Sequence, residues 1–230
     1  MLTVNDIRAE FIDKLSAEEF VVDKTGQKTI EILGASFLAD ESAIFGKVNK
    51  EYVSAEIDWY LSESTNIYDI YHDGRHPPEA WEYCADEHGN INSNYGKLIF
   101  DKKYYSQFNA VVKELINNKD GRRATMIYNR PSIWVEYNEN GKNDFICTNA
   151  VTYYIRDNLI HAAVQMRSND VVFGYKNDRA WQKYVLRELC EAINYSDEYM
   201  FEDDFKPGDI IWQVQNLHVY ERHFHLVTGE

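Results

Sequence analysis

The segment from residue 146 to residue 168 constrains the fold most, because two alternating, β-branched stretches flank Asp157–Asn158. Such a pattern is typical of a β-hairpin with a short turn. A hairpin turning there brings Cys147, at one end of the first strand, opposite the neighbourhood of Arg167 and Ser168 at the end of the second. The sequence therefore predicts two antiparallel strands with a thiol and a guanidinium at their open end.

Helical and strand periodicities alternate along the rest of the chain. Apolar residues recur at helical spacing in the stretches 4–19, 50–61, 104–118 and 178–193. Strand-like stretches cover residues 21–37, 122–128 and 209–227. Residues 68–97, which contain Pro77 and Pro78, are expected to form loops. This mixture without repeats predicts an α/β (α+β) fold on a mixed sheet, in a single domain over residues 1–230.

Composition narrows the class of protein. Of the 230 residues 44% are hydrophobic, which is enough for one sizeable core. The formal net charge of −14 repels polyanions and makes duplex nucleic acid a poor partner, although a few local arginines can hold a small phosphate-bearing ligand. No stretch reaches the roughly 18 apolar residues of a membrane helix, and the first residues lack the basic start and apolar core that are typical of a signal peptide. We therefore expect no membrane partner and a cytoplasmic location.

Three cysteines without zinc-site spacing predict neither a disulfide nor a structural metal.

Cys147 is the candidate nucleophile. An intracellular cysteine is by default a buried, inert thiol, but a guanidinium beside it stabilises the thiolate and favours nucleophilic chemistry. Arg167 with Ser168, and the pair Arg122 and Arg123, could donate to phosphate oxygens, because arginine offers a planar fork of donors that matches an oxyanion. Solvated surface arginines or salt bridges are the plain alternative for both pairs.

Other polar residues have both a functional and a plain interpretation. Lys24, in a turn, is a further phosphate candidate or simply an exposed lysine. Glu56 lies mid-helix beside aromatic residues, where burial would raise its pKa toward general acid/base use; a surface salt bridge is the alternative. His218 and Tyr220 share one face of the last strand, with His223 on the opposite parity, and could hold a sugar hydroxyl or serve as polar core residues.

A flat heterocycle could be recognised by two groups of residues. Trp81, Tyr95 and Asp170 could form an apolar and hydrogen-bonding platform, although an aromatic core is an equal alternative. Asp178, after Asn177, is by default the N-cap of the helix predicted from residue 178. A carboxylate there could also read a base, because it accepts from the amino group of cytosine, whereas an amide suits uracil.

Several ordered motifs resemble the thymidylate synthase superfamily, and most closely its phage branch, the deoxycytidylate 5-hydroxymethyltransferases. The resemblance runs from about Val21 to Val227. The motifs that carry it are DFICTNAVTYYIRDN, MRSNDVVFGYKNDRAWQKYV, GDIIWQVQNLHVYERH, EIDWYLSESTN, INSNYG and GRRA. The resemblance implies a thymidylate-synthase-like mixed, twisted sheet flanked by helices, and a homodimer.

The resemblance also implies a role for each matching residue. Cys147 would add to C6 of the pyrimidine, and Glu56 would order water and move protons. The residues implied at the 5′-phosphate are Lys24, Arg167 and Ser168 of one subunit and Arg122 and Arg123 of the other. Those implied at the base and the deoxyribose are Asn177, Asp178, His218 and Tyr220. Those implied at the folate pocket and its proton network are Trp81, Tyr95 and Asp170.

The implied activity transfers a one-carbon unit from 5,10-methylenetetrahydrofolate, a co-substrate, to C5 of dCMP. Addition of water would give 5-hydroxymethyl-dCMP for modified phage DNA in the cytoplasm of an infected cell, without a metal. Asp178, in place of the asparagine by which the synthases read uracil, is the hallmark of this branch. Two alternatives remain: thymidylate-synthase-like methylation of dUMP or dCMP, and a nucleotide-binding homologue without turnover.

The chain departs from the synthases at three places. Thr148 follows the candidate nucleophile where they have histidine, and Asn177 stands where they have an aromatic residue; both changes fit the phage branch. The chain ends at Glu230, soon after the last predicted strand. We therefore expect the C-terminal segment that covers the folate in the family to be short or missing.

Overall fold

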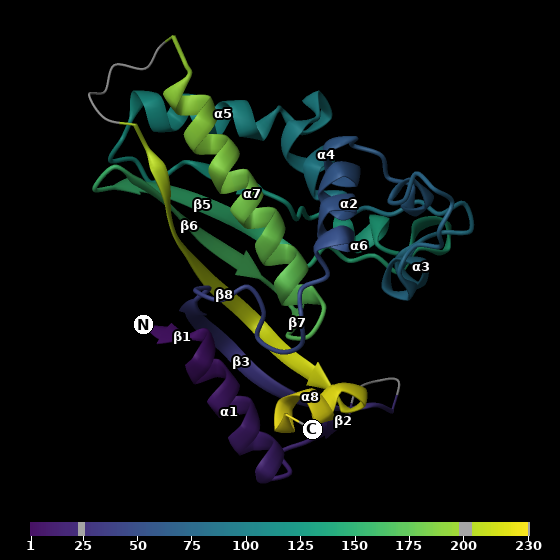
Figure 1. Cartoon of the computed structure of the whole chain (residues 1–230). Helices are drawn as coiled ribbons and strands as arrows, with labels where there is room; N and C mark the ends of the chain where they lie inside the picture. The colour runs from purple at the N-terminus through teal and green to yellow at the C-terminus, as the bar shows by residue number, and fades with distance from the viewer. Residues whose placement is uncertain (23–25, 198–203, 230) are drawn as a thin grey trace. The chain divides into compact units, whose positions relative to one another are not determined.

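The computed structural model describes residues 1–22, 26–197 and 204–229. The chain forms two compact units. The first comprises Met1–Val48 and Thr152–Glu230, and the second comprises Asn49–Val151. The helices and strands of both units are labelled in Figure 1.

The first unit is built on a mixed β-sheet. Its strands are β1 (Leu2–Thr3), β2 (Val21–Val22), β3 (Lys28–Leu38), β6 (Leu159–Met166), β7 (Asn169–Asp170), β8 (Lys206–Tyr220) and most of β5 (Thr148–Arg156). They are hydrogen-bonded in the order β1-β3-β8-β6-β5, with β2 on β3 and β7 on β8. β3 runs antiparallel to β8, whereas β6 and β7 run parallel to it. The predicted α/β class with a mixed sheet is therefore confirmed.

The predicted hairpin is also confirmed. β5 ends at Arg156 and β6 begins at Leu159, so Asp157 and Asn158 alone form the turn. Both have positive φ, 51° and 58°, as the right-handed twist of a two-residue hairpin requires. Aspartate and asparagine tolerate this left-handed conformation better than other non-glycine residues, which explains why the sequence signal was reliable.

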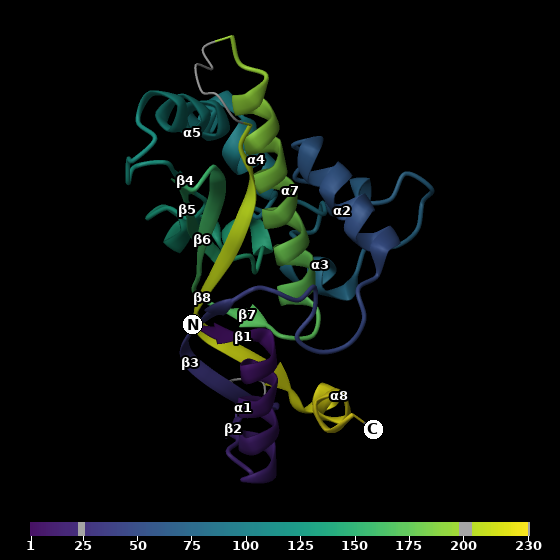
Figure 2. The ribbon, with the colours of Figure 1, turned by 60° about the vertical axis from the view of Figure 1, so that its left-hand side comes forward.

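The helices α1 and α7 pack on this sheet. α1 (Val4–Ser16) starts at a capping box in which Thr3 and Asp6 satisfy each other's backbone N–H groups, and it lies along β3 in Figures 1 and 2. α7 (Gly174–Asn194) packs on β6 and β8. α7 begins four residues before Asp178, so the interpretation of Asp178 as an N-cap was wrong. The sequence did not reveal that α7 starts at Gly174, because the N–H groups of Phe173 and Gly174 donate to the carboxylate of Asp170, which lies outside the helix.

The end of the chain differs from its prediction. β8 stops at Tyr220, and residues 221–228 form a 3₁₀ turn (η4, Glu221–His223) and the short helix α8 (Phe224–Thr228). The strand parity expected for His223 was therefore wrong. Apolar residues continue through this segment at spacings that fit either structure, and Phe224 stacks on Phe20 instead of extending the sheet.

The second unit is mainly helical. Its elements are α2 (Lys50–Leu61), η1 (Ile67–Asp69), α3 (Glu79–Cys84), α4 (Tyr95–Phe100), η2 (Lys102–Tyr104), α5 (Gln107–Asn117), β4 (Thr125–Ile127), α6 (Ile133–Glu136), η3 (Glu139–Gly141) and the first residues of β5. α2 has the predicted bounds. Residues 68–97 are not all loop, because α3 starts at Glu79, directly after its N-cap residue Pro78.

α4 approaches α2 at a glycine. A Cβ on Gly96 would lie 1.9 Å from the backbone oxygen of Tyr60, so only glycine allows the two helices to meet here.

Across the described ranges, no helix combines the length and the apolar character that crossing a membrane demands.

Candidate active site

Asp178 is held by a directed chain of hydrogen bonds within the first unit. The indole N–H of Trp212, on β8, donates to Oδ1 of Asn169 over 3.2 Å. Nδ2 of Asn169 then donates to Oδ2 of Asp178 over 2.8 Å. Trp212 and Asn169 are buried, at 0% and 4% exposure, whereas Asp178 is half-buried. The carboxylate of Asp178 is thus fixed from the protein side, in a residue that is half-buried. The sequence motif contained Asn169, but no function was predicted for it.

Two further candidates are Asn177, in the first turn of α7, and Asp170, on β7. Oδ1 of Asn177 is buried and has no hydrogen-bond partner, which makes it an acceptor that a ligand could satisfy. Asp170 uses its carboxylate on three backbone N–H groups, those of Val172, Phe173 and Gly174. Asp170 is therefore fixed, and its first observed role is structural.

β7 and β8 bring the predicted sugar and phosphate residues together. Asp170 is the register partner of His218, and the backbone oxygen of Arg167 accepts from the N–H of Asn216. The rings of His218 and Tyr220 meet edge to face at 5.0 Å. Burial lowers the pKa of His218 from its usual 6.5, so the imidazole is neutral near pH 7. Arg167 and Ser168, both half-buried, directly precede β7. This edge of the sheet thus presents a guanidinium, a hydroxyl, a neutral imidazole and a phenol.

In the second unit, Glu56 is a buried carboxylate at the centre of a hydrogen-bonded triangle. Glu56 is 5% exposed, and its Oε1 accepts from the hydroxyl of Tyr52 and from the indole N–H of Trp81, over 2.5 and 3.2 Å. The same indole N–H lies 2.9 Å from the hydroxyl of Tyr52. Burial raises the pKa of Glu56 to about 7, against the opposing effect of the two donors. Such a carboxyl group can both take and give a proton near neutral pH.

Tyr52 was missed by sequence reasoning. It lies one turn before Glu56 on α2, and the i, i+4 spacing was the available signal. Burial raises the pKa of Tyr52 well above its usual value, so the phenol remains a donor to Glu56. The burial predicted for Glu56 is present, and the surface salt bridge is not.

Tyr95 belongs to an aromatic stack. Its ring lies 5.4 Å from that of Tyr60 and 5.2 Å from that of Tyr128, and it is 4% exposed. Trp81 meets Trp59 edge to face at 5.2 Å but is half-buried. Trp81 therefore keeps an accessible surface for a flat ligand, whereas Tyr95 packs in the core of its unit.

Cys147 directly precedes β5 and is half-buried. The loop before it is anchored by Asp144, whose carboxylate accepts from the N–H of Asn92 over 2.6 Å and from the N–H and hydroxyl of Ser93 over 2.8 and 2.6 Å. Asn92 returns a bond from its amide to the backbone oxygen of Asp144. Burial raises the pKa of Asp144. Asp144 thus connects the loop of Cys147 with the INSNYG segment, a link that sequence reasoning did not find.

The remaining phosphate candidates are Arg122, Arg123 and Lys24. Arg122 and Arg123 are exposed, and Arg123 pairs with Glu114 over 3.2 Å. Lys24 lies outside the described residues. Cys147, Glu56, Trp81 and Tyr95 belong to the second unit, whereas Asp170, Asp178, His218 and their neighbours belong to the first. Their assembly into one site, including the approach of Cys147 to Arg167, stays a prediction.

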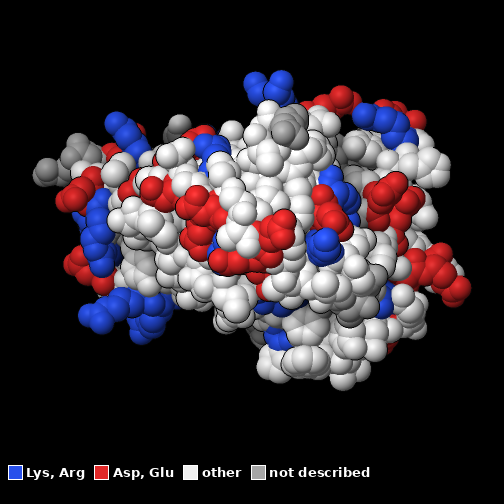
Figure 3. Space-filling model, turned by 90° about the horizontal axis from the view of Figure 1, so that it is seen from below, with Lys and Arg blue, Asp and Glu red and all other residues white. Residues whose placement is uncertain are grey.

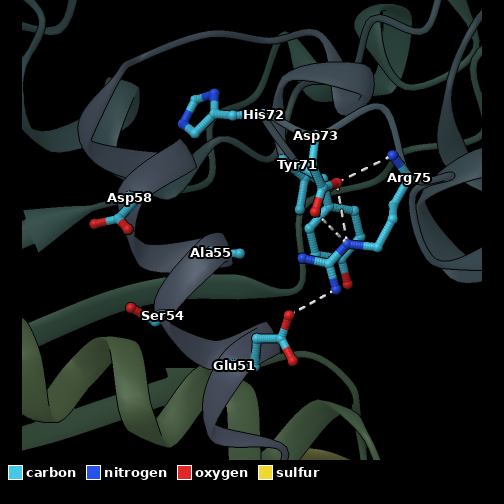
Figure 4. Close-up of a pocket in the computed structure, with 9 residues that line it drawn as sticks. Glu51, Ser54, Ala55, Asp58, Tyr71, His72, Asp73 and Arg75 are labelled. Atoms are coloured by element: carbon cyan, nitrogen blue, oxygen red, sulfur yellow. Dashed lines mark hydrogen bonds and ion pairs between the residues drawn. The ribbon is translucent and has the colours of Figure 1, made fainter.

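The second unit carries a hollow whose lining includes none of the predicted site residues. It is lined by Glu51, Ser54, Ala55, Asp58, Ile70, Tyr71, His72, Asp73 and Arg75. Arg75 pairs with Glu51 over 2.7 Å and with Asp73 over 2.8 Å, as Figure 4 shows. Because its guanidinium is already neutralised, the hollow offers no charge to an anion.

The surface agrees with the acidic composition. On the face drawn in Figure 3, acidic and basic side chains are interspersed, and no continuous basic surface covers it. Within the ranges that the structure describes, no group of three or more His, Cys, Asp or Glu side chains could hold a metal ion.

Comparison with known proteins identifies the enzyme family of this chain. The sequence profile of thymidylate synthase matches residues 12–230, and the chain belongs to this family. Over 234 residues it is 50% identical to the proteins named deoxycytidylate 5-hydroxymethyltransferase in Enterobacteria phages T4 and T2, covering 100% of this chain and 93% of each relative. The solved structure of thermostable thymidylate synthase A from Bacillus subtilis shares the fold, with a TM-score of 0.71 and 18% identity over 99% of this chain and 83% of that one.

Proposed function

We propose that this protein is a deoxycytidylate 5-hydroxymethyltransferase. It transfers a one-carbon unit from 5,10-methylenetetrahydrofolate to C5 of dCMP and adds water, giving 5-hydroxymethyl-dCMP and tetrahydrofolate. The identity with the phage relatives over the whole chain supports this activity. The observation that carries the choice of base is the carboxylate of Asp178, bound on one oxygen by Asn169. A carboxylate only accepts, so it suits the N4 amino group of cytosine and opposes O4 of uracil.

Cys147 is the nucleophile of the proposed reaction. Its sulfur bonds to C6 and sends the electron pair of the C5–C6 double bond to C5, which becomes the attacking carbon. Bound 5,10-methylenetetrahydrofolate supplies a carbon at the oxidation level of formaldehyde. After C5 has taken that carbon and lost its proton, the bond between the carbon and the folate nitrogen breaks, so that tetrahydrofolate leaves and an exocyclic methylene remains on C5. Water then adds to this methylene carbon. Cys147 then leaves C6 as the ring double bond forms again.

Glu56 acts as the general base toward that water in the proposed reaction. With a pKa of about 7 it can accept a proton from water at the moment when the oxygen bonds to carbon. Tyr52 and Trp81 hold Oε1, so the carboxylate is oriented before the ligand arrives. Water, and not hydride, then completes the product, which distinguishes this enzyme from a methylating synthase.

The co-substrate has matching groups on both units. Trp81 offers an aromatic face whose polar N–H is already satisfied, which suits a flat pterin ring. We assign Asp170 and Tyr95 to the same pocket and its proton network. Asp170 keeps acceptor capacity beyond the N–H groups that it binds, because a carboxylate has about four lone-pair directions.

The nucleotide's phosphate and sugar define the remaining roles. We assign the 5′-phosphate to Lys24, Arg167 and Ser168, and the 3′-hydroxyl to His218 and Tyr220. The unpartnered Oδ1 of Asn177 supports its place beside the base. Arg122 and Arg123 complete the phosphate site from the partner of a homodimer, each chain acting as a single catalytic domain over residues 1–230. Arg123 must exchange Glu114 for the phosphate when it does so.

The phage origin of the relatives supports a biological setting for the proposed activity. We place the enzyme in the cytoplasm of an infected bacterial cell, where its product would enter modified phage DNA. The chain's partners are then dCMP, the folate and a second copy of itself.

Release of tritium from C5 tests the proposal. Protein mixed with 5,10-methylenetetrahydrofolate and C5-tritiated dCMP should release label to water and form 5-hydroxymethyl-dCMP, and tritiated dUMP should react far more slowly. Cys147→Ser should abolish release, whereas Cys84→Ser should not. Formation of dihydrofolate, detected by its absorbance, would show methylation instead. Absence of label release would leave a nucleotide-binding protein and contradict the proposal.

A further inference from the structure

We infer that Asn169 is a specificity-determining positioning residue, which decides which atom of the side chain at position 178 faces the base. The inference rests on the proposed function, because it requires residue 178 to contact the pyrimidine. It concerns a residue that does not itself touch the substrate, and it follows from the hydrogen bonds that link Trp212, Asn169 and Asp178.

The direction of this chain of hydrogen bonds is fixed at its buried end. An indole nitrogen carries a hydrogen and cannot accept, so Trp212 requires the oxygen of the Asn169 amide to face it. The NH2 group of Asn169 must then point the other way, toward residue 178. Trp212 is fully buried and Asn169 nearly so, and an unpaired donor in this place would be costly. The amide therefore has one stable orientation.

Packing holds the amide in that orientation. A Cβ on Gly174 would lie 2.8 Å from Nδ2 of Asn169, so the first residue of α7 leaves just enough room for this NH2 group. β7, which carries Asn169, is paired with β8, which carries Trp212 (Figure 1). The donor that reaches residue 178 thus comes from a rigid sheet, not from a loop.

A fixed donor imposes a rule on the side chain opposite it, which must present an acceptor. Asp178 satisfies the rule with Oδ2, and its carboxylate remains acceptor-only toward a ligand, which suits the cytosine amino group. An amide at position 178 would have to turn its oxygen toward Asn169 and its NH2 group toward the base, which suits O4 of uracil. Asn169 thereby converts a change of one atom at position 178 into a change of base preference.

The rule predicts that exchanging the two residues restores the preference for cytosine. In the double variant Asn169→Asp/Asp178→Asn, the carboxylate at position 169 accepts from Trp212 and also from the new amide at position 178. The NH2 group of that amide is then turned away from the base, and its oxygen faces the amino group of cytosine. A residue that served only to keep the fold intact could not reverse the preference in this way.

The experiment compares binding of dCMP and dUMP, without folate, by titration calorimetry. The parent should prefer dCMP, and Asp178→Asn should prefer dUMP. The double variant should shift the dCMP-to-dUMP affinity ratio back toward dCMP by at least about tenfold relative to Asp178→Asn, the effect of one well-placed hydrogen bond. The matched control is Asn194→Ala, which breaks a similar two-ended asparagine bridge, to Phe205, at the other end of α7 and should leave the parental ratio unchanged.

A second variant keeps the test decisive if the exchanged protein does not fold. Trp212→Phe in the Asp178→Asn background removes the donor that fixes the amide of Asn169, so the preference for dUMP should narrow. A double variant that folds and keeps the full dUMP preference of Asp178→Asn overturns the role of Asn169. Parent protein that converts no dCMP to 5-hydroxymethyl-dCMP contradicts the proposed function instead, so the two failures are distinguishable.

Discussion

Trp81 donates the N–H of its indole to the same carboxylate oxygen of Glu56 that accepts from Tyr52. The two donors come from different elements, Trp81 from α3 and Tyr52 from α2. They partly offset the burial that raises the pKa of Glu56, so the balance between donors and burial sets the protonation state of this carboxyl group.

The stability of the protein should depend on pH through Glu56. The pKa is raised from 4.5 to about 7, so the folded state binds this proton more tightly than the unfolded state. The resulting stabilisation is complete below about pH 4.5 and is lost as pH rises through 7, by an amount on the order of 3 kcal/mol. Urea unfolding at several pH values measures it. Glu56→Gln, which mimics the protonated form, should remove this component, and an unchanged pH dependence in that variant would contradict it.

Removing the phenol of Tyr52, beside Glu56, should shift the pH dependence of kcat/KM. Tyr52→Phe deletes a donor that lowers the pKa of Glu56, so the limb of log kcat/KM that reports this group should shift to higher pH. Tyr71→Phe is the matched control, because Tyr71 contacts the ring of Tyr52 at 6.4 Å but does not bond to Glu56. Equal profiles for the two variants would mean that Tyr52 does not tune the carboxylate.

Asp144→Ala should lower both stability and turnover. It leaves the N–H groups of Asn92 and Ser93 without their buried acceptor, at a cost of about 2 to 4 kcal/mol, and it frees the loop before Cys147. Asp86→Ala provides the comparison, since Asp86 accepts from the N–H groups of His88 and Asn90 in a more exposed turn. Denaturant unfolding should show a larger loss of stability, and tritium release a larger loss of turnover, for Asp144→Ala than for Asp86→Ala. A similar loss in both would show that burial of Asp144 is unimportant.

Thiol labelling should separate the cysteines. Burial raises the pKa of Cys190 to about 12, so this thiol should resist iodoacetamide in the folded protein near neutral pH. Cys147 should react, and saturating dCMP should protect it if the nucleotide covers it as proposed. Mass spectrometry of digested protein measures each site. Labelling of Cys147 that dCMP leaves unchanged would argue against a nucleotide at that position.

Gly96→Ala should be among the most damaging single substitutions. Its new methyl group would lie 1.9 Å from the backbone oxygen of Tyr60, and a backbone atom cannot move aside without separating α4 from α2. We expect a loss above roughly 3 kcal/mol. Gly208→Ala is the contrast, because its methyl group would meet the His161 ring at 2.8 Å, and a side chain can yield. Thermal unfolding of both variants should give a much larger drop in Tm for Gly96→Ala.

The sequence predicted the elements whose signals are local. The turn at Asp157–Asn158 was found because both residues tolerate positive φ, and the bounds of α2 were found because its apolar spacing is regular. The start of α7 was missed because its cap is Asp170, a residue that the strand β7 contributes from outside the helix. The last residues were missed because short apolar stretches fit a strand or a helix equally well.

The candidate site shows the same division between local and non-local signals. Burial of Glu56 was predictable from its aromatic neighbours on one helix. The partners that give the site its chemistry were not, because Trp81 meets Glu56 from 25 positions away and Asn92 meets Asp144 from 52. Spacing along a sequence carries no signal for such contacts. Asn169 lies in one of the motifs that carry the family resemblance, but its hydrogen bond to Trp212 exists only once β7 is paired with β8.

β7 is only two residues long, yet Asn169 donates to Asp178 and Asp170 pairs in register with His218. In the proposed function, the residues assigned to the pentose and those assigned to the base therefore share one scaffold but use different atoms of it. Under that proposal, a lineage would change the nucleotide that it modifies by altering one or two codons, while its hold on the sugar stays intact.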